Sequence, residues 1–211
     1  MSAWLSPLGA IYAVWIVWMV SWELAGLWSS RAQATPGIRL QSSFRVFTSV
    51  GFLLLLITPP WPWGLGGWKR IYEQPLLKTL TAPLWSTPET LGWVLAGVAL
   101  AGLLFCWWAR VHLGALWSSA ITRKADHRIV DTGPYGLVRH PIYTGILTLG
   151  LAIALDKATP IALVGLLSLC VGYWMKSRME EGFLRSELGA DAYDAYRARV
   201  PMLIPFLPTK R

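Results

Sequence analysis

Five apolar stretches alternate with polar segments along the 211-residue chain. They cover residues 8–28, 44–63, 89–110, 142–155 and 161–175. A helix of about 20 apolar residues crosses the roughly 30 Å hydrocarbon core of a bilayer. The pattern therefore predicts an all-α integral membrane protein with about five transmembrane helices.

The last two stretches are separated only by a short polar turn, Asp156–Pro160. They therefore predict a C-terminal helical hairpin. Its first arm, 142–155, is short for a full span. We expect that arm either to be tilted or to end within the bilayer.

Beyond residue 175 the chain becomes polar but keeps residues that favour helix. Gly189 followed by Ala190 and Asp191 suggests that one helix ends and another begins, with Asp191 as the N-cap. We expect tail helices at about 176–188 and 191–200. Prolines 201, 205 and 208 then end regular structure.

The composition agrees with a membrane protein. Hydrophobic residues make up 55% of the chain and charged residues 14%, against about 25% charged residues in a typical soluble domain. A soluble protein of this size leaves too much surface exposed to hide so many apolar side chains. Intrinsic disorder is excluded because the chain is too hydrophobic and carries too little charge.

The distribution of positive charge predicts the orientation. The net charge is +8, and 15 of the 19 Lys and Arg residues lie in segments 29–45, 110–140 and 176–211. Cytoplasmic loops carry the excess of Lys and Arg, so we expect these segments in the cytoplasm and the N-terminus outside. A surplus of positive charge could also bind nucleic acid. The membrane interpretation already accounts for the surplus, so no nucleic-acid partner is expected.

The two cysteines, Cys106 and Cys170, lie within apolar stretches, so we expect them to be packing residues. No zinc-ligand spacing occurs, and no metal site is predicted. The chain also lacks a dinucleotide-binding glycine motif after a strand, a Walker motif and a serine-hydrolase elbow. A soluble nucleotide-binding fold is therefore excluded.

The most informative polar residues surround the start of the fourth stretch. Pro141 suits the first position of a helix, which places Arg139 and His140 at its N-terminal mouth and Tyr143 in its first turn. Free N–H groups, the positive end of the helix dipole and Arg139 together predict an anion site. The alternative is a simple juxtamembrane anchor, because Arg, His and Tyr are common at the membrane interface.

A second cluster follows the fifth stretch. Glu181 has helix partners in Arg178 and Arg185 at spacings of three and four residues, whereas Glu180 has only Lys176. A carboxylate beside a basic pocket can receive an ammonium group or a ribose hydroxyl. The alternative is a solvated helix face.

Three further residues are candidates. Arg110 and His112 end the third stretch; a histidine in the position of His112 is more often an ordinary interface residue than a catalyst. Glu23 is the only acid well inside a predicted span. Intramembrane acids are often functional, although Glu23 lies near a span end from which it can reach the headgroups.

The C-terminal half contains several short blocks in a fixed order. They are Leu113-Gly-x-x-Trp117-Ser118, His127-x-Ile129-Val130-x-x-Gly133-Pro134-Tyr135, Arg139-His140-Pro141-x-Tyr143-x-Gly145, Glu180-Glu181-x-x-Leu184, Tyr193-x-x-Tyr196 and Val200-x-x-Leu203-Ile204-Pro205-Phe206. In this order, over roughly residues 110–206, the blocks resemble the isoprenylcysteine carboxyl methyltransferase family and the related phospholipid methyltransferases.

The resemblance implies methyl transfer from S-adenosyl-L-methionine to a lipophilic acceptor that enters from the bilayer. The acceptor is a prenylcysteine-like carboxylate, a lipid amine or a thiol, and the active site faces the cytoplasm. Residues 1–109 then form three spans on the acceptor side, and residues 110–211 form the methyltransferase core. The implied cofactor-binding residues are His127, Ile129, Val130, Gly133, Tyr135, His140, Tyr143, Glu180 and Glu181.

The catalytic candidates are Arg139, His140 and Glu23. A carboxylate acceptor needs no general base, whereas an amine or a thiol must lose a proton; His140, Glu23 and His112 are the possible bases. An NADPH-dependent membrane reductase of the sterol reductase type is the alternative enzyme, and a non-enzymatic membrane scaffold is the third interpretation. The sequence gives no oligomeric state.

Overall fold

The computed structural model describes residues 5–26, 38–59, 69–117 and 129–207, and these ranges contain helices and no strand. The helices are α1 (Pro7–Gly26), α2 (Ile38–Phe52), α3 (Lys69–Tyr72), α4 (Pro75–Thr81), α5 (Glu89–Leu113), α6 (Pro134–Leu137), α7 (Pro141–Lys157), α8 (Pro160–Leu188) and α9 (Ala190–Arg199). A π-helical turn, η2 (Leu53–Ile57), extends α2, and a 3₁₀ turn, η4 (Gly114–Leu116), follows α5.

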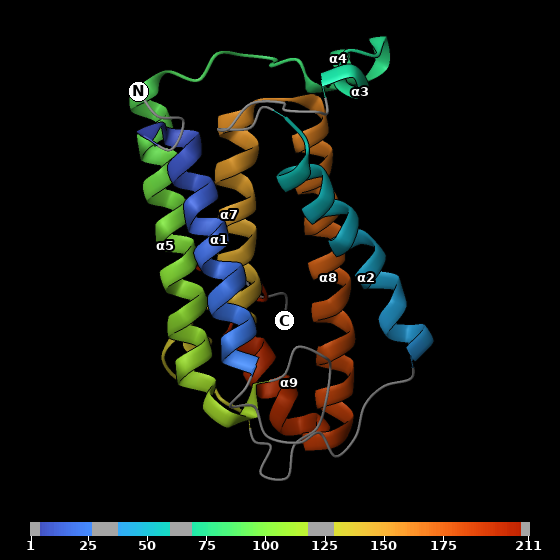
Figure 1. The fold of residues 1–211 in the computed structure, drawn as a ribbon. Helices are drawn as coiled ribbons and strands as arrows, with labels where there is room; N and C mark the ends of the chain where they lie inside the picture. The colour runs from blue at the N-terminus through green and yellow to red at the C-terminus, as the bar shows by residue number, and fades with distance from the viewer. Residues whose placement is uncertain (1–4, 27–37, 60–68, 118–128, 208–211) are drawn as a thin grey trace.

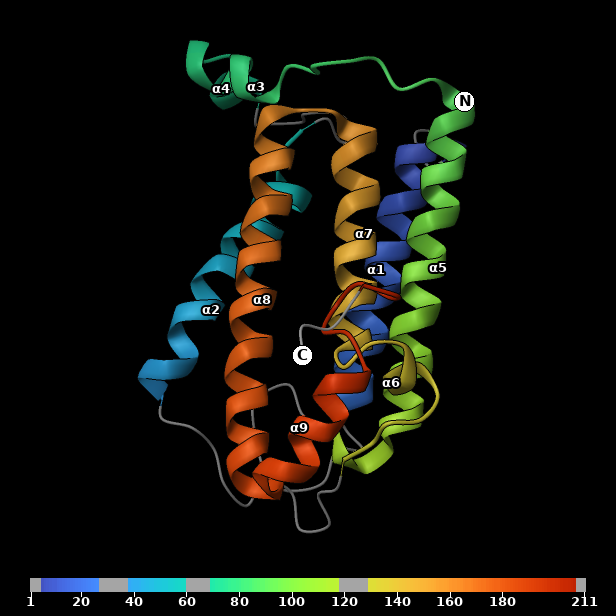
Figure 2. The same ribbon diagram turned by 180° about the vertical axis from the view of Figure 1, so that it is seen from behind.

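The five longest helices of the described chain run alternately up and down (Figure 1). Helix α5 packs along α7 and α1, whereas α2 packs along α8. Helices α3 and α4 and the turn between α7 and α8 lie at one end, and α6 and α9 lie at the other (Figure 2). The predicted C-terminal hairpin is therefore present as α7 and α8.

Within the residues that the structure describes, three helical segments are long and apolar enough to cross a membrane: Pro7–Ala25, Glu89–Leu116 and Pro160–Leu188. A shorter apolar segment, Gln41–Ile57, lies against α8. These helices support an integral, all-helical membrane protein. The count of five spans and the orientation stay predictions.

Several predicted boundaries were wrong. The second apolar stretch becomes helical at Ile38 and ends at Ile57, because the π-helical turn is followed by an extended residue, Thr58. The fifth does not end at 175, because α8 continues without a break to Leu188 and includes the expected helix 176–188. Gly189 does separate α8 from α9, but as the N-cap of α9 itself, in place of Asp191.

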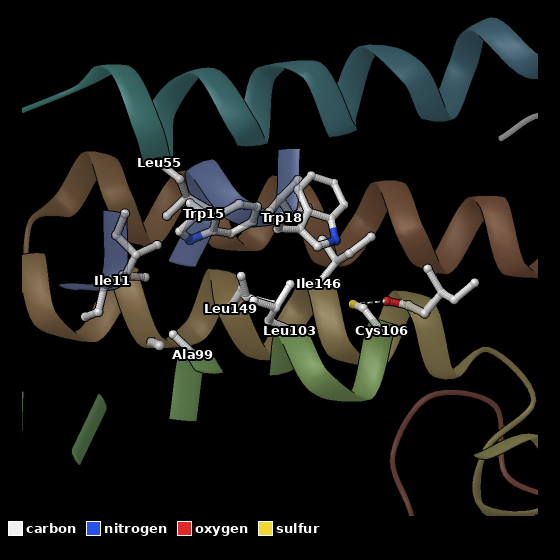
Figure 3. Close-up of a cluster of buried hydrophobic side chains, with 14 of the residues drawn as sticks. Ile11, Trp15, Trp18, Leu55, Ala99, Leu103, Cys106, Ile146 and Leu149 are labelled. Carbon is white, nitrogen blue, oxygen red and sulfur yellow. Dashed lines mark hydrogen bonds between the residues drawn. The ribbon is translucent and has the colours of Figure 1, made fainter. Parts of the chain in front are cut away.

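The core lies between α1, α5, α7 and the end of α2 (Figure 3). Ile11, Trp15, Leu55 and Leu149 are completely buried in it. Cys106 is also buried, and its thiol donates to the carbonyl oxygen of Ile142 at 3.3 Å. This cysteine is a packing residue, as predicted.

Lys157 closes the end of the core that lies farthest from α9. Its ammonium donates to the carbonyl oxygens of Leu55 (2.6 Å) and Thr58, and it lies 5.3 Å from the ring centre of Tyr12. The hydroxyl of Tyr12 donates to the carbonyl of Leu56 at 3.0 Å. Together these bonds satisfy carbonyl groups that the end of a helix leaves without partners.

Helices α5 and α7 approach closely because two glycines face each other. A Cβ placed on Gly145 would lie 2.4 Å from the sulfur of Cys106 and 2.6 Å from the carbonyl oxygen of Gly102. Small residues at such crossings let helix backbones touch, which is a common basis of helix packing in membranes. This contact fixes the position of α7, and therefore of the residues at its N-terminal mouth.

We expect Gly145→Ala to destabilise the protein, because the added methyl group overpacks the crossing. Overpacking of this kind costs about 1–3 kcal/mol. Thermal unfolding in detergent measures the effect. Gly97→Ala on the exposed face of α5 is the matched control, because nothing lies within 4 Å of its Cβ position. Equal unfolding temperatures for the two variants would contradict the assignment of this contact.

Candidate functional site

The N-terminal mouth of α7 is bound to the chain that follows α9. Pro141 occupies the first turn of α7 and His140 is the residue before it, as the sequence predicts. The backbone N–H groups of Arg139 and His140 donate to the carbonyls of Pro201 (2.8 Å) and Met202 (3.1 Å). This proline-containing segment is thereby held across the mouth.

Arg139 forms a buried ion pair with Glu181 of α8. Its Nε donates to Glu181 Oε1 at 2.8 Å, and both side chains are nearly inaccessible to solvent. The guanidinium also donates to the carbonyl oxygens of Arg197 and Val200. One side chain therefore joins α7, α8 and the end of α9.

This pairing corrects one expectation. The helix partner expected for Glu181 at Arg185 is wrong, because Arg185 pairs with Asp194 of α9 at 2.7 Å. The second acid–base contact of Glu181 comes from His140, whose Nε2 lies 3.2 Å from Glu181 Oε1.

Glu180 lies beside Glu181 but in a different environment. The hydroxyl of Tyr143 donates to Glu180 Oε2 at 2.6 Å, and His140 Nδ1 lies 3.8 Å from the same oxygen. The rings of His140 and Tyr143 stack with centres 5.3 Å apart. The side chain of Glu180 is 28% exposed, against 6% for Glu181, so Glu180 is the more accessible carboxylate.

Helix α9 covers the site through two tyrosines three residues apart. The hydroxyl of Tyr196 donates to the backbone carbonyl of Tyr135 at 2.8 Å. Burial raises the pKa of Tyr196, so its phenol remains a neutral donor. Tyr193 is buried beside it, with the two rings edge to face at 6.0 Å.

These elements enclose one cavity with two chemically different ends. The charged and hydroxyl-bearing end contains Arg139, His140, Tyr143, Lys176, Glu180, Tyr193 and Tyr196. The other end is apolar and is lined by Trp18, Trp22, Leu113, Leu116, Trp117, Ile142 and Ile146. Ile129, Val130, Leu184 and Leu188 add apolar surface from the loop before α6 and from α8.

The structure brings most of the sequence-predicted residues together. Those that line the cavity are Ile129, Val130, Tyr135, Arg139, His140, Tyr143 and Glu180. Glu181 lies behind them as the partner of Arg139 and His140. His127 lies outside the described residues.

Other candidates lie away from the cavity. Glu23 is on an exposed position of α1. Gly133 has a φ of +56°, and a Cβ there would lie 2.8 Å from the His112 ring, so this glycine accommodates His112 instead of lining the cavity. His112 also lies 3.0 Å from the Thr132 hydroxyl. Arg110 is completely buried and donates to the carbonyl oxygens of Ala25 and Gly114, joining the ends of α1 and α5.

Trp18 and Trp22 of the apolar end were not among the residues expected at the site, whereas Trp117 lies in the first of the ordered blocks. Trp18 and Trp22 are four residues apart on α1 and therefore share one helix face, which is a signal that the sequence carries. Lys176 was considered only as a helix partner of Glu180. In the structure it lines the cavity 4.9 Å from the ring centre of Tyr143.

The described residues contain no group of three His, Cys, Asp or Glu side chains that could hold a metal ion.

Glu181→Gln tests the buried ion pair. We expect it to lower the stability of the folded state by about 3–5 kcal/mol, because it leaves the Arg139 charge buried without its partner. Thermal unfolding in detergent and protease sensitivity of the C-terminal tail measure this loss. Asp194→Asn removes one partner of the exposed pair with Arg185 and is expected to change little. A Glu181→Gln protein as stable as Asp194→Asn would show that the tail is held by other contacts.

Comparison with known proteins gives a family match for the central part of the chain. Residues 94–185 match the model of the isoprenylcysteine carboxyl methyltransferase family. A Protein-S-isoprenylcysteine O-methyltransferase of Schizosaccharomyces pombe is 36% identical over 104 residues, which cover 47% of this chain and 43% of that protein.

Two bacterial proteins are also similar. The nickel-cobalt-cadmium resistance protein NccN of Alcaligenes xylosoxydans xylosoxydans is 28% identical, with 68% of this chain and 65% of that protein covered. The cobalt-zinc-cadmium resistance protein CzcN of Cupriavidus metallidurans is 30% identical, with 60% and 54% covered. The chain thus matches between 43% and 65% of the length of these relatives.

A solved structure of the eukaryotic intramembrane Ras methyltransferase ICMT aligns with 84% of this chain and 71% of that one, at 20% identity and a TM-score of 0.48. The family match includes the mouth of α7 and Glu180 of α8, which line the polar end of the cavity. The resemblance of this chain to the isoprenylcysteine carboxyl methyltransferase family is therefore confirmed over residues 94–185.

Proposed function

We propose that the protein transfers a methyl group from S-adenosyl-L-methionine to a lipophilic acceptor within the membrane. The observation that carries the proposal is the convergence of His140, Tyr143 and Glu180 on one cavity that also has an apolar end. The family match and the name of the yeast relative support the same reaction class. The matches give no support to the reductase alternative.

The polar end of the cavity fits the methyl donor. Glu180 accepts hydrogen bonds and is partly exposed, so it suits the ammonium group or a ribose hydroxyl. The apolar side chains of Ile129, Leu184 and Leu188 suit an adenine ring. Lys176 and the N-terminal end of α7 supply positive charge for the carboxylate of the methyl donor. Arg139 is not needed for this role, because it pairs with Glu181.

The cofactor, when bound, supplies an electrophilic methyl group on a sulfonium centre with a good leaving group. The protein then has to align the acceptor with that methyl group and exclude water. Alignment alone can supply roughly 7–11 kcal/mol of a barrier. Arg139 and Glu181 act as positioning residues in this account, because they fix α7 against α8 and leave Glu180 and Tyr143 facing the cavity.

The acceptor we favour is a carboxylate of the prenylcysteine type, which is already ionised and would attack the methyl carbon of the bound donor without first losing a proton; the S–CH3 bond breaks as the O–CH3 bond forms, and the thioether leaves. For an amine or a thiol, a general base is needed. Of the three bases considered from the sequence, His140 lines the cavity, whereas Glu23 and His112 do not. His140 is therefore the base in that version of the reaction, with Glu180 and Glu181 beside its ring nitrogens.

Glu180→Gln tests the cofactor site. Losing a charge-assisted hydrogen bond costs about 1.5–3 kcal/mol, so the affinity for S-adenosylhomocysteine should fall roughly tenfold or more. Tyr143→Phe removes the hydroxyl that orients Glu180 and should weaken binding less. Isothermal titration of the purified protein measures both effects. Glu73→Gln, in the turn between α3 and α4 at the other end of the molecule, is the control. Wild-type affinity in Glu180→Gln would contradict this cofactor site.

The proposed orientation places the site at the cytoplasmic face. In a chain with Cys106→Ala and Cys170→Ala, a cysteine at the exposed position 73 should react with a membrane-impermeant maleimide on intact cells. A cysteine at the exposed position 186, at the opposite end of the fold, should react only after lysis. The reverse pattern, or labelling of both sites from outside, would contradict the orientation.

A further inference from the structure

The chain after α9 turns back along the bundle as a strap, residues 200–207. The carbonyl oxygens of Pro201 and Met202 accept hydrogen bonds from the backbone at the mouth of α7. The carbonyl oxygen of Leu203 accepts from the Thr144 hydroxyl, inside α7, at 2.6 Å. Figure 2 shows the strap, in red, beside α7 and level with turns of α1 and α5. The strap therefore follows the bundle instead of leaving it.

The strap lies at the depth of a membrane-spanning helix. Next to Thr144, Gly145 of α7 packs closely against Gly102 and Cys106 of α5. These two residues of α5 belong to the segment Glu89–Leu116, which is long and apolar enough to cross a membrane. At 1.5 Å per residue, Cys106 is about 15 Å from the nearer end of this segment. The strap therefore meets α7 well inside the span and not at its end.

The end of the strap exposes apolar side chains at this depth. Ile204 is 60% exposed, Phe206 90% and Leu207 54%. Residues 200–207 contain no charged, hydroxyl or amide side chain. Leu104 of α5, between the two residues that contact α7, is 60% exposed as well. The strap and α5 thus both present apolar side chains at a depth where a bilayer has acyl chains.

The backbone of the strap also suits an apolar environment. Lipid tails offer no hydrogen bonds, so peptide groups among them need partners within the protein. The carbonyls of residues 201–203 accept hydrogen bonds from the start of α7, and that of Ile204 accepts from the N–H of Leu207 at 3.4 Å. Pro201 and Pro205 have no N–H group that needs a partner. Few peptide groups of the strap therefore depend on water.

We propose that residues 204–207 are seated among the acyl chains of the leaflet nearer α9, and that this lipid contact holds the strap across the mouth of α7. The partner is the bilayer, because the exposed side chains are uncharged and lie at the depth of a spanning helix. The strap binds the backbone of Arg139 and His140, whose side chains line the polar end of the cavity. The shape of that end thus depends on contact between the strap and lipid.

Fluorescence quenching in lipid nanodiscs tests whether the strap lies in lipid. In a chain with Cys106→Ala and Cys170→Ala, a fluorophore is attached through Phe206→Cys. Doxyl-labelled acyl chains should quench it, whereas iodide in the water should not. Leu104→Cys on α5 is the lipid-exposed reference, and Ser186→Cys, exposed near the end of α8, is the water-exposed reference.

Two results of this measurement would overturn the proposal. If iodide quenches the label at position 206 as it quenches the label at position 186, the strap lies in water. If neither quencher reaches position 206, the strap is covered by protein, such as a second copy of the chain.

Hydrogen–deuterium exchange in nanodiscs tests the coupling to α7. Phe206→Asn makes the side chain polar, and asparagine tolerates the left-handed backbone at this position (φ +63°). The amides of Arg139 and His140 should then exchange about tenfold faster, which corresponds to the lower end of the usual gain from burying a phenylalanine side chain. Phe206→Leu, which stays apolar, should exchange like the wild type.

Leu104→Asn is the matched control, because it makes an equally exposed position of α5 polar without changing the strap. It should leave the exchange of Arg139 and His140 unchanged. Wild-type exchange in Phe206→Asn would overturn the proposed coupling, as would equal acceleration in Phe206→Leu or in Leu104→Asn.

Discussion

The buried ion pair between Arg139 and Glu181 is the contact on which the site depends. A guanidinium and a carboxylate removed from water are costly unless their remaining polar atoms also find partners. Here the carbonyls of Arg197 and Val200 and the imidazole of His140 supply them. The pair therefore fixes the start of α7, the part of α8 around Glu181 and the end of α9 relative to one another.

This arrangement separates the roles of the two adjacent carboxylates. Glu181 pairs with Arg139 and His140 inside the protein. Glu180 instead lines the cavity and accepts a hydrogen bond from the Tyr143 hydroxyl. The same cavity has an apolar lining where α1 contributes Trp18 and Trp22. A polar donor and a lipophilic acceptor can thus meet in one space, each in the surroundings that suit it.

Local chemistry predicted much of this from the sequence. Pro141 marks the start of α7 and Gly189 the break before α9, because proline and glycine act through their own backbone geometry. The continuity of α8 and the partner of Arg139 were not predictable in this way. Glu181 had nearby basic residues at helical spacing, and only the fold brings Arg139 close to it from 42 residues away. Trp18 and Trp22 were not expected at the site because the first apolar stretch contains several tryptophans, and the sequence does not reveal which of them line the cavity.

Methyl transfer to a lipophilic acceptor is measured by supplying methyl-labelled S-adenosyl-L-methionine to membranes that contain either the wild-type protein or an unrelated membrane protein. We expect labelled, lipid-extractable product only with the wild type, and mild base should release the label as methanol if the acceptor is a carboxylate. Base-stable label would instead indicate an amine or a thiol. If membranes that supply each of these acceptors give no labelled product above that of the unrelated protein, the proposed methyl transfer is wrong.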